Sequence, residues 1–154
     1  MLLSAGPVDA QERHGEVSRE WARFDVFFGG GVNFVEDLGT PVTLDAGVTG
    51  WLWESWGGTW GAGGWFFAMP EANQGSLVLA LRRGYSVGRR GHFQLGVGGV
   101  QARFGGEVED RVSTGPYLEI MAGSGSRQAA WSMGWRMGRG VGGQFVVLAR
   151  LFVG

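Results

Sequence analysis

The sequence contains no cysteine, which excludes a disulfide framework, a thiolate nucleophile and a cysteine-based zinc site. Proline is also scarce, with four residues in 154, and glycine has no period of three, so a collagen-like chain is excluded. Charged residues make up 18% of the chain and the formal net charge is −1, which gives no reason to expect nucleic acid as a partner. No stretch approaches about 18 consecutive apolar residues, so the sequence predicts no transmembrane helix.

Glycine and aromatic residues dominate what is present. The chain has 31 glycines, and its aromatic residues reach 13%. So many aromatic residues with so little charge exclude an intrinsically disordered chain, and the hydrophobic fraction of 44% suffices for one core. Each glycine inside a helix costs about 1 kcal/mol relative to alanine, whereas strands tolerate glycine where backbones approach closely. The composition therefore favours an all-β domain.

Eight segments follow one another from residue 23 onward, separated by clusters of glycine, proline, asparagine and aspartate. Residues of these types favour turns because they tolerate positive φ or fix the turn geometry. Regular strands joined by short connectors predict an antiparallel meander, and eight such strands close into an up-and-down barrel. The predicted strands are 23–35, 41–53, 57–69, 76–87, 92–104, 112–123, 128–137 and 143–153.

The N-terminal residues differ in character from this repeat. The segment from Leu2 to Ala10 looks like the tail of a secretory signal peptide, with a small residue at the cleavage point after Ala10 and a polar start to the mature chain. This interpretation implies that the start codon has been placed too late; an ordinary flexible tail is the alternative. We therefore expect a signal-peptide remnant and a polar lead-in over 1–22, and a single barrel domain over 23–154.

Three features of the repeat favour a barrel that spans a membrane. The strands are longer than the roughly five or six residues usual in soluble proteins, and a tilted strand needs about nine to eleven residues to cross a bilayer. The first, third and fifth connectors are longer than the second, fourth and sixth, as in barrels with long extracellular loops and short periplasmic turns, although the seventh is short. Large apolar residues alternate with small or polar ones, the pattern of a lipid-facing exterior and a polar lumen. A soluble barrel would instead pack its bulky face inside.

The pattern over residues 23 to 153 resembles that of the small eight-stranded outer-membrane barrels, the OmpA- and OmpX-like class. The end of the last strand departs from this class, because Phe152 falls on the face opposite to the alternating Phe145, Val147, Ala149 and Leu151. The resemblance implies a monomer in the outer membrane of a Gram-negative bacterium, secreted through a signal peptide and inserted by the barrel-assembly machinery. The lipid bilayer and lipopolysaccharide are then its partners, and its role is structural or one of surface interaction.

Charged residues gather on the face that this arrangement turns toward the lumen. Three acids oppose three arginines, and an eight-stranded barrel is only wide enough for its side chains to fill it. Buried charges must pair, and arginine suits such pairs through its forked donors. We expect a salt-bridge network that plugs the lumen and leaves no open pore, formed by Asp25, Asp45, Arg82, Glu119, Arg136 and Arg150. A catalytic or proton-conducting role is the alternative.

Tryptophan is frequent near the second turn and in the seventh strand. At a membrane surface an indole ring places its apolar body among the headgroups and its N–H toward water. We expect an aromatic girdle made of Trp51, Trp53, Trp56, Trp60, Trp65, Trp131 and Trp135. Stacking on a carbohydrate or another ligand is the alternative. The segment 58–60 also weakly resembles avidin-like soluble barrels, so a lipocalin- or avidin-like barrel that binds a small apolar ligand is the second interpretation.

Residues that would carry catalysis are few. Some small outer-membrane barrels are lipid A deacylases, and a resemblance to them would require a His-x-Ser pair on a late strand plus an acid. His14 lies in the polar lead-in and His92 precedes Phe93 and Gln94, so neither forms this motif, and we expect His92 at a surface or interface. No spacing of histidines and carboxylates predicts a metal site. An enzyme that modifies outer-membrane lipid is the third interpretation, and we predict no catalytic residue, metal or cofactor.

Five residues conflict with a uniform barrel wall. Arg83 falls on the lipid-facing side, where its side chain must extend to the nearby interface. Pro116 interrupts a strand that has no free edge, which predicts a bulge. Three glycines would face lipid at positions where bulk is expected, namely Gly30, Gly64 and Gly99.

Overall fold

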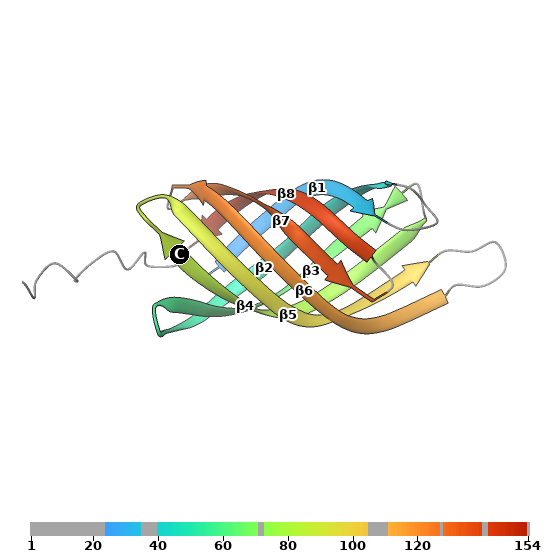
Figure 1. Cartoon of the computed structure of the whole chain (residues 1–154), viewed down its shortest axis with the longest axis horizontal. Helices are drawn as coiled ribbons and strands as arrows, with labels where there is room; N and C mark the ends of the chain where they lie inside the picture. Colours follow the sequence, from blue (N-terminus) through green and yellow to red (C-terminus); the bar gives the residue numbers. More distant parts are fainter. Residues whose placement is uncertain are drawn as a thin grey trace, which may run out of the picture.

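The computed structural model describes residues 24–34, 40–70, 73–104, 111–126, 128–139 and 142–153, without the side chains of Phe104 and Arg111. The predicted signal-peptide remnant and lead-in over 1–22, including His14, lie outside the described residues. Eight strands form one closed barrel (Figure 1). They are β1 (Phe24–Phe34), β2 (Val42–Ser55), β3 (Gly58–Met69), β4 (Gln74–Val87), β5 (Gly91–Phe104), β6 (Arg111–Gly125), β7 (Ala129–Gly138) and β8 (Gly142–Val153).

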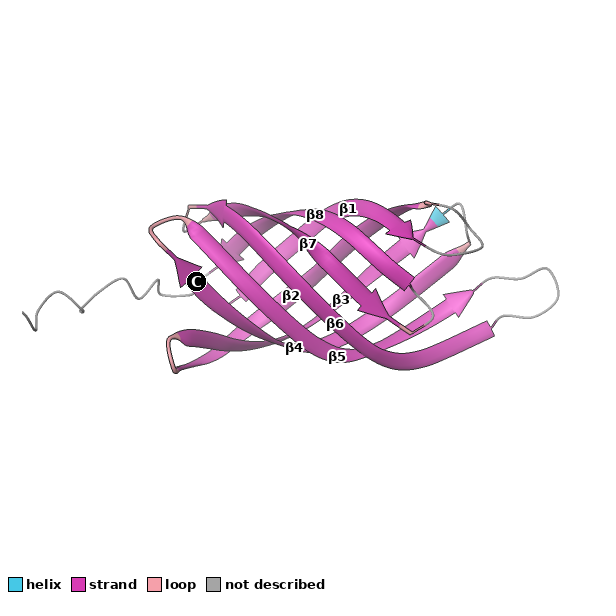
Figure 2. Ribbon diagram, in the orientation of Figure 1, coloured by secondary structure: helices cyan, strands magenta, loops and turns pink. Residues whose placement is uncertain are grey.

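Each strand pairs antiparallel with the next, and β1 pairs with β8 to close the barrel. The eight-stranded antiparallel meander predicted from the sequence is confirmed, and every strand begins and ends within two residues of its predicted bounds. Figure 2 shows that strands make up nearly all of the wall. Within the described ranges, no helix has both the length and the apolar character needed to cross a membrane.

The register fixes the dimensions of the barrel. Following hydrogen-bonded partners once around the wall from Phe24 leads back to β1 at Phe34, ten positions further along the strand. A shear of ten with eight strands implies a strand tilt of about 40° and a backbone radius of about 8 Å. An interior of this width is one that inward-pointing side chains fill.

The two ends of the barrel differ in their connections. We call the end where β1 begins and β8 finishes the terminal end; the turns β2–β3, β4–β5 and β6–β7 also lie there (Figure 1). The opposite end, with the remaining connections, is the loop end. The β2–β3 turn consists of Trp56 and Gly57, whose φ values of 48° and 72° are those of a type I′ hairpin turn. The connector predicted at 54–56 therefore lies about one residue later.

The two faces of the barrel wall have opposite compositions. Large apolar side chains point outward, as for Phe28 on β1, which is 55% exposed, and Leu79 on β4, which is 64% exposed. Polar and charged side chains point inward, and Asp25 and Thr49 are completely buried. This arrangement is the reverse of a soluble barrel, in which the bulky apolar face is packed inside. The second interpretation, with the bulky face turned inward, is thus not the arrangement that these residues adopt.

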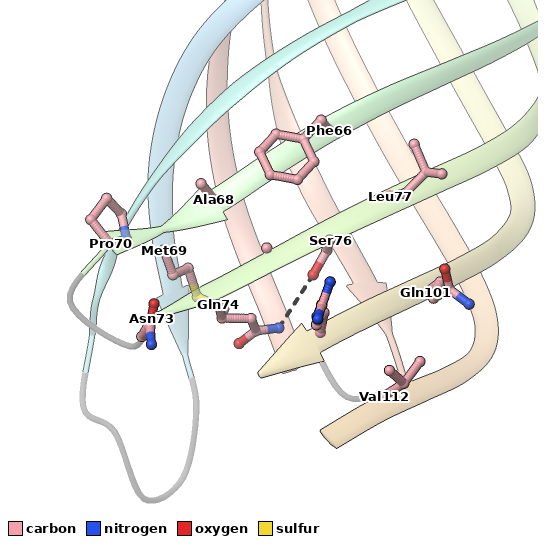
Figure 3. A pocket seen from close by; sticks show the side chains of 12 residues that line it. Phe66, Ala68, Met69, Pro70, Asn73, Gln74, Ser76, Leu77, Gln101 and Val112 are labelled. Carbon is pink, nitrogen blue, oxygen red and sulfur yellow. Dashed lines mark hydrogen bonds between the residues drawn. The ribbon is translucent and has the colours of Figure 1, made fainter. Parts of the chain in front are cut away.

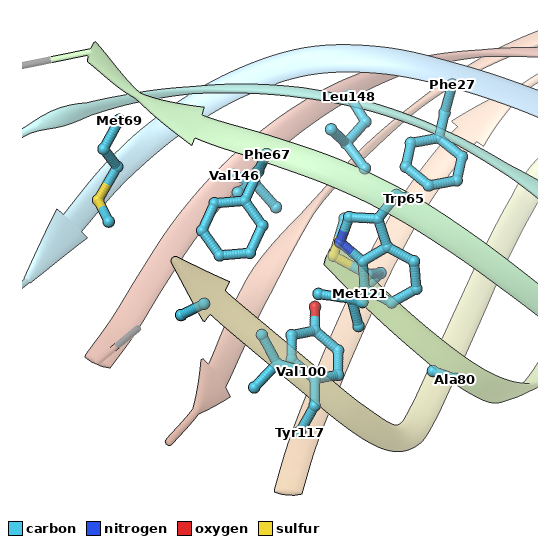
Figure 4. Close-up of a cluster of buried hydrophobic side chains, with 12 residues drawn as sticks. Phe27, Trp65, Phe67, Met69, Ala80, Val100, Tyr117, Met121, Val146 and Leu148 are labelled. Carbon is cyan, nitrogen blue, oxygen red and sulfur yellow. The ribbon is translucent and has the colours of Figure 1, made fainter. Parts of the chain in front are cut away.

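A cluster of apolar side chains nevertheless occupies part of the interior (Figure 4). Trp65 lies at its centre, with its ring centroid 6.1 Å from that of Phe27 and 5.1 Å from that of Tyr117, both in edge-on geometry. Gly47 makes room for these rings, because a Cβ at this position would lie 2.2 Å from the Cβ of Trp65. The glycines of the inner face therefore allow large side chains from other strands to share a narrow space.

The bulge predicted at Pro116 is wrong. Pro116 pairs in unbroken register with Gly99 of β5, and the one register shift among the described strand pairs lies between Trp51 and Trp53. The main-chain oxygen of Pro116 accepts a hydrogen bond from the N–H of Arg139 at 3.2 Å, just past the end of β7 at Gly138. Proline is tolerated there because the one bond that it cannot donate lies beyond the last paired residue of β7.

Candidate functional site

All six charged residues that the sequence assigns to the lumen lie inside the barrel. They come from six different strands, and none is more than 4% exposed. Each acid contacts an arginine. Arg82 donates from Nε to Oε1 of Glu119 at 2.7 Å and from Nη2 to Oε2 at 3.3 Å, a forked geometry. The other two pairs are Arg136 with Asp45 and Arg150 with Asp25.

Glu119 connects these pairs into a network. Its carboxylate accepts a hydrogen bond from Nε2 of Gln94 at 2.6 Å, and its Oε2 lies 3.6 Å from Nε of Arg136. The side-chain oxygen of Gln94 accepts from Nη1 of Arg150 at 2.8 Å. Arg82 also donates to the hydroxyl of Thr49. The three ion pairs are therefore linked through one carboxylate and one amide.

Aromatic rings fill the space between the guanidinium groups. The guanidinium carbon of Arg82 lies 4.0 Å from the ring centroid of Trp65, and that of Arg136 lies 5.1 Å from the same ring. Phe27 is flanked in the same way by Arg82 at 4.9 Å and Arg150 at 5.8 Å. Cation–π contacts are strongest when the groups are shielded from water. The interior thus combines charge pairing with contacts between cations and aromatic rings.

The prediction of an aromatic girdle is wrong for two of its seven residues. Trp65 belongs to the interior cluster and is 2% exposed. Trp51 also points inward, and its Nε1 donates to Oδ2 of Asp25 at 3.4 Å. Both occupy inward positions of their strands, where the indole contacts lumen side chains.

The other five residues of the predicted girdle lie on the outside of the wall. Trp53 and Trp60 face each other across the β2–β3 hairpin with ring centroids 6.4 Å apart, and Trp56 at its turn is highly exposed. Trp131 lies near the same end, on β7. Trp135 lies further toward the loop end and stacks on Phe34, with ring centroids 5.4 Å apart. Aromatic residues are therefore present on the exterior toward both ends.

The expectation that His92 lies at a surface is wrong. Its side chain points into the terminal end of the barrel, and its Nε2 lies 2.8 Å from the hydroxyl of Ser132 on β7. Gly123 of the intervening strand leaves the space, because a Cβ there would lie 2.5 Å from the imidazole. A His–Ser contact thus exists without the His-x-Ser motif. Within the described part of the chain, no group of three or more histidines and carboxylates could hold a metal ion.

A hollow of about 760 Å³ opens at the loop end, on the outer side of β3 to β6 (Figure 3). Phe66 and Leu77 form an apolar part, and Gln101 and Arg103 bring polar groups to its side. Gly75 lies beside the Phe66 ring, whose nearest atom would be 3.0 Å from a Cβ at this position. The hollow therefore offers an apolar surface beside hydrogen-bond donors. The sequence did not point to it, because its lining comes from four strands.

The fold, but not the sequence, matches known proteins. No protein-family model and no curated protein sequence matches the chain. Among solved structures, it is similar to the crystal structure of neisserial surface protein A, with a TM-score of 0.58 and 11% sequence identity. The alignment covers 84% of this chain and 96% of the neisserial protein.

Proposed function

We propose that this chain is a small bacterial outer-membrane β-barrel with a side-chain-plugged lumen and a structural or surface-interaction role. The observation that carries the proposal is the inverted composition of the wall, with charged residues inside and large apolar residues outside. If this apolar exterior were exposed to water, the protein would tend to aggregate. Large contiguous apolar surfaces mark contacts with a membrane or with another protein. The resemblance in fold to a neisserial surface protein supports the same reading.

The strand lengths fit a bilayer. Strands contain from 10 residues in β7 to 15 in β6. At a rise of about 3.3 Å per residue and a tilt of about 40°, they rise about 25 to 38 Å along the barrel axis, against an apolar band of about 25 Å in barrels of this kind. The strands therefore cross the hydrocarbon region and extend into the interfaces.

The orientation follows from the connections. With the termini and short turns in the periplasm and the other connections outside the cell, Trp53, Trp60 and Trp131 belong to the periplasmic interface and Trp135 to the outer one. We further propose secretion through a signal peptide, insertion by the barrel-assembly machinery and contact with lipopolysaccharide. The loop-end hollow beside Arg103 is the candidate contact surface for an external partner.

The proposed plug depends on the ion pairs of the lumen. Three acids and three arginines neutralise one another, and their buried side chains fill the space inside a backbone radius of about 8 Å. Ions therefore find no continuous water path. This barrel is proposed to act through its surfaces rather than by conducting solutes.

Two measurements test the proposal. The full chain, refolded in detergent, is expected to partition into the detergent phase and to migrate differently on a gel before and after boiling, as a closed barrel does. Reconstituted into planar bilayers, it is expected to give no steady conductance. A chain that folds as a monomer without detergent would refute the membrane location, whereas steady ion currents would refute the plug alone.

A further inference from the structure

A groove crosses the outer surface of β1 to β5, from Phe24 at the terminal end of β1 to Val97 in the middle of β5. Three small outward residues, Gly50, Ala62 and Gly64, form its floor, and Gly50 pairs directly with Ala62 across the β2–β3 ladder. The groove holds about 910 Å³. Its walls are larger apolar side chains, provided by Phe24, Val48, Leu79, Leu81 and Val97.

The register makes this groove continuous. Hydrogen-bonded partners run from Phe24 through Gly50, Ala62 and Leu81 to Val97, so the row crosses five neighbouring strands. A second row pairs Val48, Gly64 and Leu79 one outward position closer to the loop end. The smallest residues of both rows lie side by side on β2 and β3. A flexible hydrocarbon chain fits a depression of this shape.

A cation lies directly at the terminal side of the groove. Arg83 pairs with Trp60, and this pair is the next outward pair after Leu81 and Ala62 on the same two strands. Arg83 therefore lies two residues from the groove wall, about 7 Å along the strand.

The structure holds the Arg83 guanidinium in a defined place. Its Nη2 donates to the main-chain oxygens of Ser55 at 3.0 Å and Trp56 at 3.2 Å. The rings of Trp60 and Tyr85 lie 4.9 Å and 5.2 Å from the guanidinium carbon. The side chain is thus fixed beside the β2–β3 turn, as the sequence required of an arginine that must extend to an interface.

The remaining donors of Arg83 have no acceptor in the described ranges. Both hydrogen bonds use Nη2, whereas neither Nε nor Nη1 donates to a described residue. A positive charge on the lipid side of a barrel is costly, by about 2 to 4 kcal/mol at the bilayer centre and less near the interface. An anionic oxygen beside the guanidinium would offset this cost and accept a hydrogen bond from Nη1.

We propose that this exterior surface binds one phospholipid of the leaflet at the terminal end. Its phosphate contacts Arg83 between Trp60 and Tyr85, and one acyl chain lies on the floor formed by Gly50, Ala62 and Gly64. The inference rests on the proposed membrane location. A second copy of the chain is the less favourable occupant, because a two-fold contact through this face would bring two Arg83 side chains into one interface.

Native mass spectrometry of the full chain in detergent tests the site. The probe is a synthetic phosphatidylglycerol with two 16- to 18-carbon chains, added in steps, with a diacylglycerol of the same chains as the arm without phosphate. We expect one retained phosphatidylglycerol and weaker retention of diacylglycerol. Arg83→Gln removes the charge and is expected to lower the affinity about tenfold, the loss of one charged hydrogen bond. Ala62→Leu fills the floor and is expected to lower the affinity for both lipids.

Matched variants separate this site from general effects on the barrel. Ala149→Leu places the same side chain on an exposed alanine of β8, away from the groove, and Arg90→Gln removes an exposed arginine in the β4–β5 turn. Both are expected to retain the lipid as the wild type does. Heat-modifiable gel mobility is measured for every variant, because Arg83 also contacts the turn.

The outcomes distinguish the two proposals. If the wild type fails to fold in detergent, the membrane location fails. If it folds but Arg83→Gln and Ala62→Leu retain as much lipid as the wild type, the phospholipid site is refuted and the membrane location stands. A dimer that Ala62→Leu dissociates would refute the phospholipid as occupant and assign the groove to a second copy.

Discussion

Replacing Asp45 and Arg136 by leucine, singly and together, tests whether the lumen charges act as pairs. The two residues face each other from β2 and β7 and are both buried. Among the described residues, Arg136→Leu leaves Asp45 with one hydrogen-bond donor, the hydroxyl of Thr43, 3.2 Å from Oδ2. Asp45→Leu leaves Arg136 with Glu119, at 3.6 Å, so its charge keeps a partner. The structure therefore predicts unequal effects for the two single substitutions.

The magnitudes follow from these remaining contacts. Removing one partner of a buried pair costs about 3 to 5 kcal/mol, because the other charge is left uncompensated. We expect Arg136→Leu near the upper limit and Asp45→Leu near the lower one, as losses in the free energy of unfolding. The double variant leaves no unpaired charge at this position, and apolar replacement of a buried pair is often nearly neutral. Its loss should therefore fall below the sum of the two by at least about 2 kcal/mol.

Urea unfolding of the barrel refolded in micelles, followed by tryptophan fluorescence, measures these losses. Arg90→Leu in the exposed β4–β5 turn is the matched control, and it should change the free energy by less than about 0.5 kcal/mol. Two results would refute the reasoning: single variants as stable as the control, or a double variant whose loss equals the sum of the two.

Two further pairs of substitutions test the interior, each by the same urea unfolding. Gly96→Val should destabilise by about 3 kcal/mol or prevent folding, because a Cβ there would lie 2.6 Å from Cγ of Glu119, which its ion pairs hold in place. Position 99 faces outward, and a Cβ there would lie 3.8 Å from its nearest neighbouring atom, so Gly99→Val should leave the urea midpoint unchanged. Equal effects of the two glycine substitutions would contradict a tightly packed lumen. Trp65→Leu should cost about 3 kcal/mol through lost packing and cation–π contacts, whereas Trp56→Leu at the exposed turn should cost less than about 1 kcal/mol. A larger effect at Trp56 would place the stabilising indole contacts outside the barrel.

The strands and their faces were predictable because both depend on local sequence. A period of two assigns each side chain to one face, and the turn residues mark where a strand ends. The β2–β3 turn shows the limit of this approach. Trp56 adopts a positive φ, which few residues other than glycine favour, so the turn was placed one residue early.

The partners inside the lumen were only partly predictable. The alternation of side chains along each strand was sufficient to place Asp45 and Arg136 on the inner face. Which acid contacts which arginine depends on the shear of the closed barrel. The same holds for Trp65, whose space is provided by Gly47 on the neighbouring strand. No pattern within β3 reveals that a lumen this narrow can accept an indole, so its assignment to a girdle was wrong.

The register shift in β2 explains why two tryptophans only two residues apart lie on opposite faces of the wall. Strict alternation would turn Trp51 and Trp53 to the same face, but the irregularity between them leaves Trp51 inside and Trp53 outside. Bulges re-aim side chains in this way.

The ion pairs join parts of the chain that are far apart in sequence. Asp25 and Arg150 are separated by 125 positions, and Asp45 and Arg136 by 91. In an assembly intermediate in which β1 has not yet paired with β8, these aspartates and arginines lack their partners. Exposing such unpaired charges to hydrocarbon is costly. Complete charge compensation is reached only when the last strand has paired with the first. Transfer into lipid is thus most favourable after closure or together with it, so the order of assembly is encoded in which residues neutralise one another.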